Sequence, residues 1–185
     1  MGSDANQSSL QDAIFAGGCF WCIEAAFDLM PGVAEAISGY TGGDVEDPTY
    51  EEVVTGTTGH LEAVLVRFDP DQVSYQELLD QFWRSIDPTD PGGQFYDRGS
   101  QYETAIFFLD DEQRELAEAS KEALAESGVF DAPIATKIRQ AEPFYVAEEY
   151  HQDYATKYLQ RYKMYSVGSG REAFLEETWN GESGD

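Results

Sequence analysis

Short apolar runs alternate along this chain with segments of helical periodicity, and this alternation constrains the fold more than any other feature. Buried strands are indicated at 13–16, 33–40, 61–68 and 104–109. Helical spacing marks 19–29, 75–86, 110–127 and 147–162, and a short edge strand is expected at 134–138. This order predicts an α/β fold, as a two-layer α+β sandwich with a ferredoxin-like βαββαβ core and additional C-terminal helices.

Capping residues mark several of these helix ends. Ser74 and Glu77 have the capping-box spacing. Asp110 is placed to cap the next helix, and Gly128 to end it. These residues therefore predict where the helix at 75–86 begins and where the helix at 110–127 begins and ends.

Composition changes only at the two ends of the chain, which predicts one domain. We expect a catalytic domain at 12–175, between a disordered N-terminal tail (1–11) and an acidic C-terminal tail (176–185). Two long irregular segments interrupt the domain, at 41–60 and 87–103. Loops of that length inside a compact domain are usually functional.

The charge is extreme: 36 Asp and Glu stand against 11 Lys and Arg, a net charge of −25. This excludes general binding of nucleic acid, because neutralising phosphates needs clustered Lys and Arg, and it disfavours an anionic membrane surface. Aromatic residues make up 14% of the chain, so a folded core is still expected. A lysine-poor acidic surface favours a salt-loaded cytoplasm and a halophilic source.

The cysteines and the N-terminus indicate the compartment. Residues 1–12 resemble no secretory signal, and no apolar run approaches the roughly 18 residues of a transmembrane helix. The chain has two cysteines, Cys19 and Cys22, which exclude a disulfide scaffold. We expect a cytoplasmic protein whose cysteine pair serves redox chemistry, catalysis or metal binding.

The segment Gly-Gly-Cys-Phe-Trp-Cys at 17–22 is the most informative motif. Its glycines permit a sharp turn from strand to helix. Cys19 then starts the helix, where free N–H groups favour a thiolate. Two buried cysteines acting as small hydrophobes would be the ordinary alternative. A metal site with His60 and His151 is disfavoured, since neither histidine has a partner at zinc-finger spacing.

Four motifs in order resemble the A-type peptide methionine sulfoxide reductases. They are the cysteine segment 17–22, then 48–50 with 58–64, then 96–102, and finally 143–145 with 149–152. Together they cover about 13–159, so the resemblance spans nearly the whole predicted domain. It implies reduction of methionine-S-sulfoxide in proteins, as repair of oxidative damage.

The resemblance assigns roles to individual residues. Cys19 is the nucleophile that becomes a sulfenic acid, and Glu62 is the proton donor. The sequence supports Glu62, because period-2 alternation places it on one strand face with Val64 and Val66. An acid on an apolar face has a raised pKa and stays protonated near neutral pH.

Further roles concern the substrate. Tyr50 and Tyr102 match tyrosines that hydrogen-bond the sulfoxide oxygen. Asp97 matches an acidic residue that orients the site through hydrogen bonds. Phe20 and Trp21 match the aromatic wall around the substrate's methyl group. No roles are assigned to His60 and His151.

The sequence departs from many family members in having no cysteine at 163–185. We expect Cys22 to resolve the sulfenic acid on Cys19, after which a thioredoxin-type reductant opens the disulfide. The alternative is direct reduction of Cys19 by an external thiol, with Cys22 only packed behind the helix. No cofactor or metal is expected, and a monomer is assumed by default.

Two other functional classes compete. A general disulfide oxidoreductase would use the two cysteines, but Phe-Trp between them is bulky and Glu62 would have no role. A non-enzymatic redox or metal-binding module is the second. Stoichiometric zinc would favour that class.

The charge leads to a prediction about salt. Added salt screens repulsion among the carboxylates, so both thermal stability and turnover should rise with salt concentration. Thermal unfolding and steady-state assays across a salt series measure this. Activity that peaks near zero added salt and then declines would reject the salt-adapted interpretation and leave the family resemblance intact.

Overall fold

A six-stranded sheet forms the centre of the computed structural model, which describes residues 9–180. Its strand order is β7-β6-β1-β3-β2-β8. The strands are β1 (Gln11–Gly17), β2 (Val33–Thr41), β3 (Leu61–Phe68), β6 (Thr104–Phe108), β7 (Lys137–Gln140) and β8 (Tyr145–Val146). The inner four strands are antiparallel in the order β6-β1-β3-β2. With the helix after β1 and the helix after β3, they form the predicted ferredoxin-like core.

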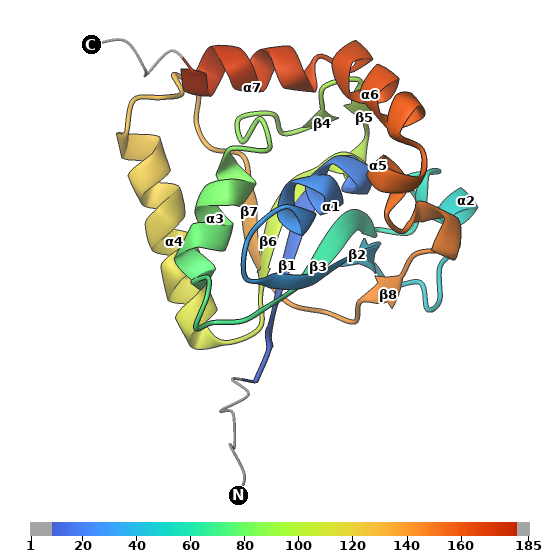
Figure 1. Ribbon diagram of the computed structural model, residues 1–185, viewed down its shortest axis with the longest axis horizontal. Helices are drawn as coiled ribbons and strands as arrows, with labels where there is room; N and C mark the ends of the chain where they lie inside the picture. The colour runs from blue at the N-terminus through green and yellow to red at the C-terminus, as the bar shows by residue number, and fades with distance from the viewer. Residues whose placement is uncertain (1–8, 181–185) are drawn as a thin grey trace, which may run out of the picture.

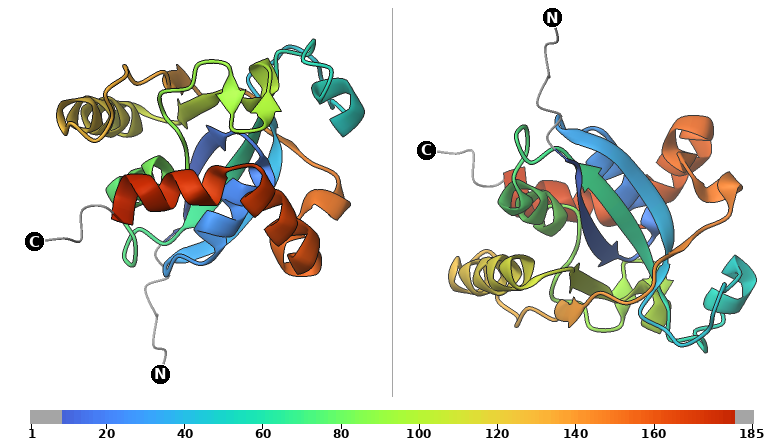
Figure 2. Two further views of the ribbon diagram at one scale, coloured as in Figure 1. Left: turned by 90° about the horizontal axis from the view of Figure 1, so that it is seen from above. Right: turned by 90° about the horizontal axis from the view of Figure 1, so that it is seen from below.

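Helices cover one face and one end of this sheet (Figure 1). They are α1 (Phe20–Asp28), α2 (Tyr50–Val53), α3 (Tyr75–Trp83), α4 (Asp111–Glu126), α5 (Tyr154–Lys157), α6 (Leu159–Gly168) and α7 (Arg171–Trp179). The segment 87–103 contains a short hairpin, β4 (Gly93–Gln94) with β5 (Asp97–Arg98), and a 3-10 turn at Ser100–Tyr102. Helices α6 and α7 lie over the end of the sheet where β1 stops and α1 begins (Figures 1 and 2).

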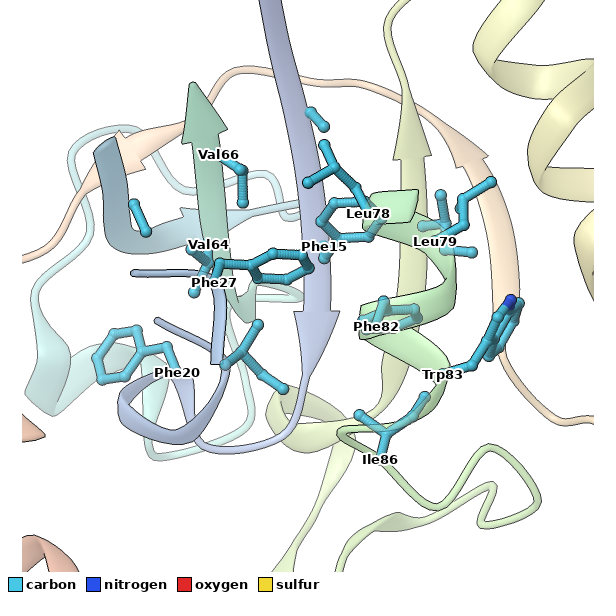
Figure 3. Close-up of a cluster of buried hydrophobic side chains, with 14 of the residues drawn as sticks. Phe15, Phe20, Phe27, Val64, Val66, Leu78, Leu79, Phe82, Trp83 and Ile86 are labelled. Carbon is cyan, nitrogen blue, oxygen red and sulfur yellow. The ribbon is translucent and has the colours of Figure 1, made fainter. Parts of the chain in front are cut away.

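The main core lies between the sheet and helices α1 and α3. Phe15 of β1 stacks between Phe27 of α1 and Phe82 of α3, with ring centroids 5.1 Å apart in both pairs (Figure 3). Val64 and Val66 of β3 face the same core. Burying these rings fixes α1 on the sheet, and α1 contains Cys22 and begins directly after Cys19.

The capping predictions are confirmed. Ser74 and Glu77 form a complete capping box at the start of α3, and Asp110 accepts from Gln113 N–H at the start of α4. Gly128 has φ of +78°, a left-handed conformation that ends α4. Helix α3 ends at Trp83, a few residues before the predicted stop.

The single helix predicted over 147–162 is wrong. The chain forms a 3-10 turn at Glu149–His151, then α5, then α6. Asp153 breaks the helix with φ of +53°, and its N–H donates to Oε1 of Glu24 at 2.5 Å. A distant carboxylate on α1 thus determines this break, so local periodicity could not reveal it.

The edge strand lies three residues later than predicted, at Lys137–Gln140 instead of 134–138. The N–H groups of Ala135 and Thr136 both donate to the carbonyl of Pro88, at 2.7 and 3.3 Å. These residues are therefore held by a loop, and pairing with β6 begins only after them.

The C-terminal boundary also differs from the prediction. Helix α7 runs to Trp179, so 176–179 are helical although they fall in the predicted acidic tail. The Arg84 guanidinium lies 4.4 Å from the Trp179 ring centroid and helps hold this end. The predicted N-terminal tail falls largely on residues 1–8, which lie outside the described residues, as do 181–185. Within residues 9–180, none of the helices has the length and apolarity needed to cross a membrane.

Candidate active site

The turn between β1 and α1 places the first cysteine. Gly18 has φ of +83°, a left-handed conformation that favours glycine. A Cβ on Gly17 would lie 2.6 Å from Cδ1 of Ile23, so close packing also requires glycine there. Cys19 follows as the N-cap residue of α1, where the sequence predicted it, and its side chain is buried.

A pocket of about 160 Å³ opens at this turn. Its lining brings together seven residues named from the sequence and one that was not: Cys19, Phe20, Trp21, Tyr50, Glu62, Asp97, Tyr102 and, in addition, Tyr165. These side chains come from α1, α2, β3, the β4–β5 hairpin, the following 3-10 turn and α6. Cys22 is not part of the lining and lies behind Cys19, one turn along α1.

Glu62 is the buried acid of the pocket. It lies on the β3 face shared with Val64 and Val66, and only 2% of its surface is exposed. Burial raises its pKa well above the usual value, and the negative charge of Asp97 acts in the same direction. The N–H of Phe20 donates to Oε2 of Glu62 at 3.2 Å and opposes this rise. Burial dominates, so the carboxyl is protonated at neutral pH.

The two cysteines form one hydrogen-bonded pair. Burial raises the pKa of Cys19 well above its usual value, and the contact with Cys22 adds to the rise. The pKa of Cys22 is lowered to about 7, first by the hydrogen bond from Cys19. Burial opposes this shift, whereas the charge of Arg171 and a hydrogen bond from Tyr162 favour it.

This distribution of charge differs from the expectation of a thiolate at Cys19. The first N–H of α1 was expected to stabilise that thiolate, but it donates to Glu62 instead. Of the two thiols, Cys22 therefore loses its proton more readily than Cys19.

The two tyrosines can act as hydrogen-bond donors, and they lie in α2 and in the 3-10 turn Ser100–Tyr102. Tyr50 begins α2, and its N–H donates to Oε2 of Glu148 at 3.1 Å. Burial, followed by the charge of Glu62, raises the pKa of Tyr50 to about 12. The same causes raise the pKa of Tyr102 still further. Both hydroxyl groups keep their protons at neutral pH and can donate to an oxygen in the pocket.

Asp97 is anchored by a residue that the sequence did not single out. The Tyr165 hydroxyl of α6 donates to Oδ2 of Asp97. Burial raises the pKa of Asp97, while this hydrogen bond and the charge of Arg171 lower it. The carboxylate thus ties the β4–β5 hairpin to the C-terminal helices.

The aromatic wall is rigid. Trp21 stacks on Tyr154 with centroids 3.8 Å apart and planes inclined by 7°. Its Nε1–H donates to Nδ1 of His151 at 3.1 Å. Phe20 lies against His151 and Tyr40, with centroids 5.0 and 5.8 Å away.

The histidines have structural roles. Nδ1 of His60 accepts from Gly43 N–H at 3.1 Å, and its Nε2 lies 2.7 Å from the carbonyl oxygen of Val45. These contacts hold the loop that leads to Tyr50. Burial lowers the pKa of His151, so it is the neutral acceptor that Trp21 requires.

Among residues 9–180, no cluster of three candidate metal ligands includes a cysteine. In the described part of the chain, one group of three candidate ligand side chains lies within 4.8 Å, and it consists of Glu24, Asp28 and Asp153. This group contains no cysteine or histidine. The metal-binding alternative therefore finds no support at the cysteine pair.

Arg171 is the main residue that the sequence analysis missed. Its guanidinium is buried, and it donates to the carbonyls of Ser85 at 2.5 Å and Gly17 at 3.0 Å. It also lies 4.8 Å from the ring centroid of Phe95. Arg171 joins α7 to the turn that carries Cys19. Its only sequence signal is a basic residue in a long stretch without acids.

Comparison with known proteins agrees with the resemblance. The family model for peptide methionine sulfoxide reductase matches residues 11–183. A Bacillus licheniformis protein named peptide methionine sulfoxide reductase MsrA is 60% identical over 167 residues, covering 90% of this chain and 92% of that protein. Reduced Mxr1 from Saccharomyces cerevisiae is similar with a TM-score of 0.74 at 31% identity, over 84% of this chain and 89% of that one.

A further structure is that of Saccharomyces cerevisiae Mxr1 in complex with Trx2. It matches with a TM-score of 0.53 at 26% identity, over 83% of this chain and 90% of that one. The family match covers nearly the whole chain and includes every segment that lines the pocket. By its motifs, its fold and these matches, the chain belongs to the A-type peptide methionine sulfoxide reductases.

Proposed function

We propose that this protein reduces methionine-S-sulfoxide in proteins to methionine, as a repair enzyme. The observation that carries the proposal is the pairing of a thiol with a protonated carboxyl in one pocket, Cys19 with Glu62. Reduction of a sulfoxide needs a sulfur nucleophile and a proton for the departing oxygen. Two tyrosine hydroxyls and an aromatic wall supply the remaining recognition of the S=O and methyl groups.

The first step transfers oxygen from the substrate to the enzyme. Cys19 gives its proton to Cys22 and attacks the sulfoxide sulfur, while Glu62 protonates the oxygen. The S–O bond of the substrate breaks, and the hydroxyl ends on Cys19 as a sulfenic acid. Methionine sulfur gains two electrons and Cys19 sulfur loses two, so the step is balanced.

We propose that Cys22 then resolves the sulfenic acid. Its sulfur attacks Sγ of Cys19, a disulfide forms, and the hydroxyl leaves with the proton held by Cys22 as water. The lowered pKa of Cys22 and its hydrogen bond with Cys19 support this role. Trp21, one of the two aromatic residues between the cysteines, stacks on Tyr154.

A thioredoxin-type protein is the proposed source of electrons. A relative of this chain, Mxr1, has been crystallised with Trx2. Such dithiol proteins operate in reducing compartments, which agrees with two unpaired cysteines, so we assign the protein to the cytoplasm. We expect no metal or organic cofactor, and we expect a monomer.

Substrate stereochemistry gives the direct test of this function. A peptide carrying both epimers of methionine sulfoxide is incubated with enzyme and dithiothreitol, and the epimers are separated by chromatography. We expect loss of the S epimer only, and no loss with Cys19→Ser. Equal consumption of both epimers would contradict the A-type activity, and insulin reduction without sulfoxide would favour a general disulfide oxidoreductase.

Replacing Glu62 by Gln tests the proton donor. Glutamine keeps the size of the side chain but cannot give a proton, so kcat/KM should fall by about 100- to 10,000-fold. The wild-type rate should decline as pH rises through the raised pKa of Glu62, and the variant should lose this decline. Unchanged alkylation of Cys19 by iodoacetamide is the control for intact thiols.

The pH dependence of folding stability gives a second test with the Glu62→Gln variant. Above the unfolded pKa of about 4.3, the unfolded chain releases a proton that folded Glu62 keeps. The free energy of unfolding of the wild type should therefore fall as pH rises from that value to the folded pKa. Glu62→Gln removes this contribution, and identical pH profiles for both proteins would contradict a buried protonated acid.

Replacing Cys22 by Ser separates resolution from direct reduction. The wild type given substrate without reductant should lose both of its thiols, and the variant should lose only one. Turnover with thioredoxin should fall by about tenfold or more, because no disulfide forms for it to open, while turnover with dithiothreitol continues. Thioredoxin-driven turnover at the wild-type rate would instead establish direct reduction of Cys19.

A further inference from the structure

Acidic residues are absent from one long segment of this acidic chain. Residues 154–171 contain no Asp or Glu, although 36 occur in the whole chain. The same segment contains four of the 11 Lys and Arg. It covers α5, α6 and the first residue of α7.

The outer face of α6 is both basic and apolar. Met164 is 76% exposed and Val167 is 64% exposed, and Arg161 and Lys163 are exposed beside them. We call these four residues the α6 face. A helix that packs by one side alone normally has a polar outer side, so exposed Met and Val next to cations are characteristic of a binding surface.

The cations of the α6 face have no ion-pair partner among residues 9–180, although the Arg161 guanidinium lies 5.9 Å from the Tyr158 ring centroid. Across residues 9–180, the exposed Arg67, Arg98, Lys137 and Lys157 form ion pairs with carboxylates of this chain. Arg161 and Lys163 form none in that part of the chain, and neither does Lys121 on α4. Lys121 is thus a matched basic residue on another face, with Glu118 and Glu122 nearby in the sequence.

The inner side of the same helix touches the redox centre. The Tyr162 hydroxyl is hydrogen-bonded to Cys22, and Tyr165 lines the pocket beside Cys19. Figures 1 and 2 show α6 at the margin of the molecule, beside the end of the sheet where α1 begins. A protein resting on the α6 face therefore contacts the helix that borders the pocket of Cys19.

The distribution of charge favours the α6 face as the binding surface for an acidic protein partner. The rest of the surface is strongly negative, so a partner with carboxylates near its own reactive thiol is repelled by most approaches. The α6 face offers cations for those carboxylates and apolar side chains for an apolar rim. Substrate peptides have no such fixed requirement, since their sequence around methionine varies.

We propose that the α6 face is the docking surface for the protein that reduces this enzyme, a thioredoxin-type dithiol protein with an apolar rim and at least one carboxylate around its reactive thiol. The proposal rests on the proposed function, because it assigns the reductant of that same site. It does not depend on which thiol accepts the electrons.

A reductant bound to the α6 face would transfer two electrons to the Cys19–Cys22 disulfide by thiol–disulfide exchange. The reductant's thiolate attacks Sγ of Cys19, the Cys19–Cys22 bond breaks, and Cys22 leaves as a thiolate. The less basic thiol is the better leaving group, and Arg171 and Tyr162 make Cys22 that thiol. The second thiol of the reductant then attacks the mixed disulfide, becomes oxidised, and releases Cys19 with both electrons transferred.

Charge reversal on the α6 face tests the proposal. The double variant Arg161→Glu with Lys163→Glu is assayed with a bacterial thioredoxin, recycled by its reductase and NADPH, and separately with dithiothreitol. We expect kcat/KM for thioredoxin to fall by about tenfold or more, mainly through KM, and its salt dependence to change. Turnover with dithiothreitol should stay at the wild-type rate, as should both activities of the control Lys121→Glu.

A second variant tests the apolar part of the face. Met164→Ser with Val167→Ser removes exposed apolar area without changing charge, and should raise KM for thioredoxin while leaving dithiothreitol turnover unchanged. Wild-type KM in both double variants would overturn the proposal, as would an equal loss with Lys121→Glu. A parallel loss with dithiothreitol would assign the face to the catalytic pocket instead. Lack of dithiothreitol activity in the wild type would reject the proposed function itself.

Discussion

The hydrogen bond between the Phe20 N–H and the Glu62 carboxyl is the contact on which the rest of the site depends. It joins the first turn of α1 to the middle of the sheet, directly beside Cys19. Because the Phe20 N–H donates to the acid, this donor is not available to a Cys19 thiolate. The same contact holds the acid within the pocket, where burial keeps it protonated. One interaction thus holds the buried carboxyl of Glu62 beside the Cys19 thiol.

Residues of the C-terminal helices α6 and α7 lower the pKa of Cys22. A buried cation is unfavourable unless it has partners, and Arg171 finds them in the carbonyls of Ser85 and Gly17. Its charge also lowers the pKa of Cys22. The family pattern described in the sequence analysis includes cysteines near the C-terminus, and residues 163–185 of this chain contain none. This chain has helices α6 and α7 there instead, with Tyr162 hydrogen-bonded to Cys22 and the Arg171 charge lowering the pKa of Cys22. The C-terminal segment stays close to the redox centre and supplies electrostatics in place of a thiol.

Much of this arrangement could be predicted from the sequence, and what could not has a common physical reason. Strands, caps and the burial of Glu62 follow from local periodicity, and the pocket-lining residues follow from motifs that the resemblance identified. The break at Asp153 could not be predicted, because a carboxylate of Glu24 on another helix fixes it. The contact of Tyr165 with Asp97 joins residues 68 positions apart. Both depend on tertiary packing, which overrides local preference.

The net charge of −25 leads to a final point about association. A uniformly acidic surface keeps a protein soluble but repels any partner of the same sign. An enzyme that must be reduced by another protein therefore needs an interruption in that surface close to its thiols. Residues 154–171 provide one without acids, and the helix that carries its outer face also contacts Cys22 through Tyr162. The distribution of carboxylates along the chain, more than their number, thus determines where an electron donor can approach.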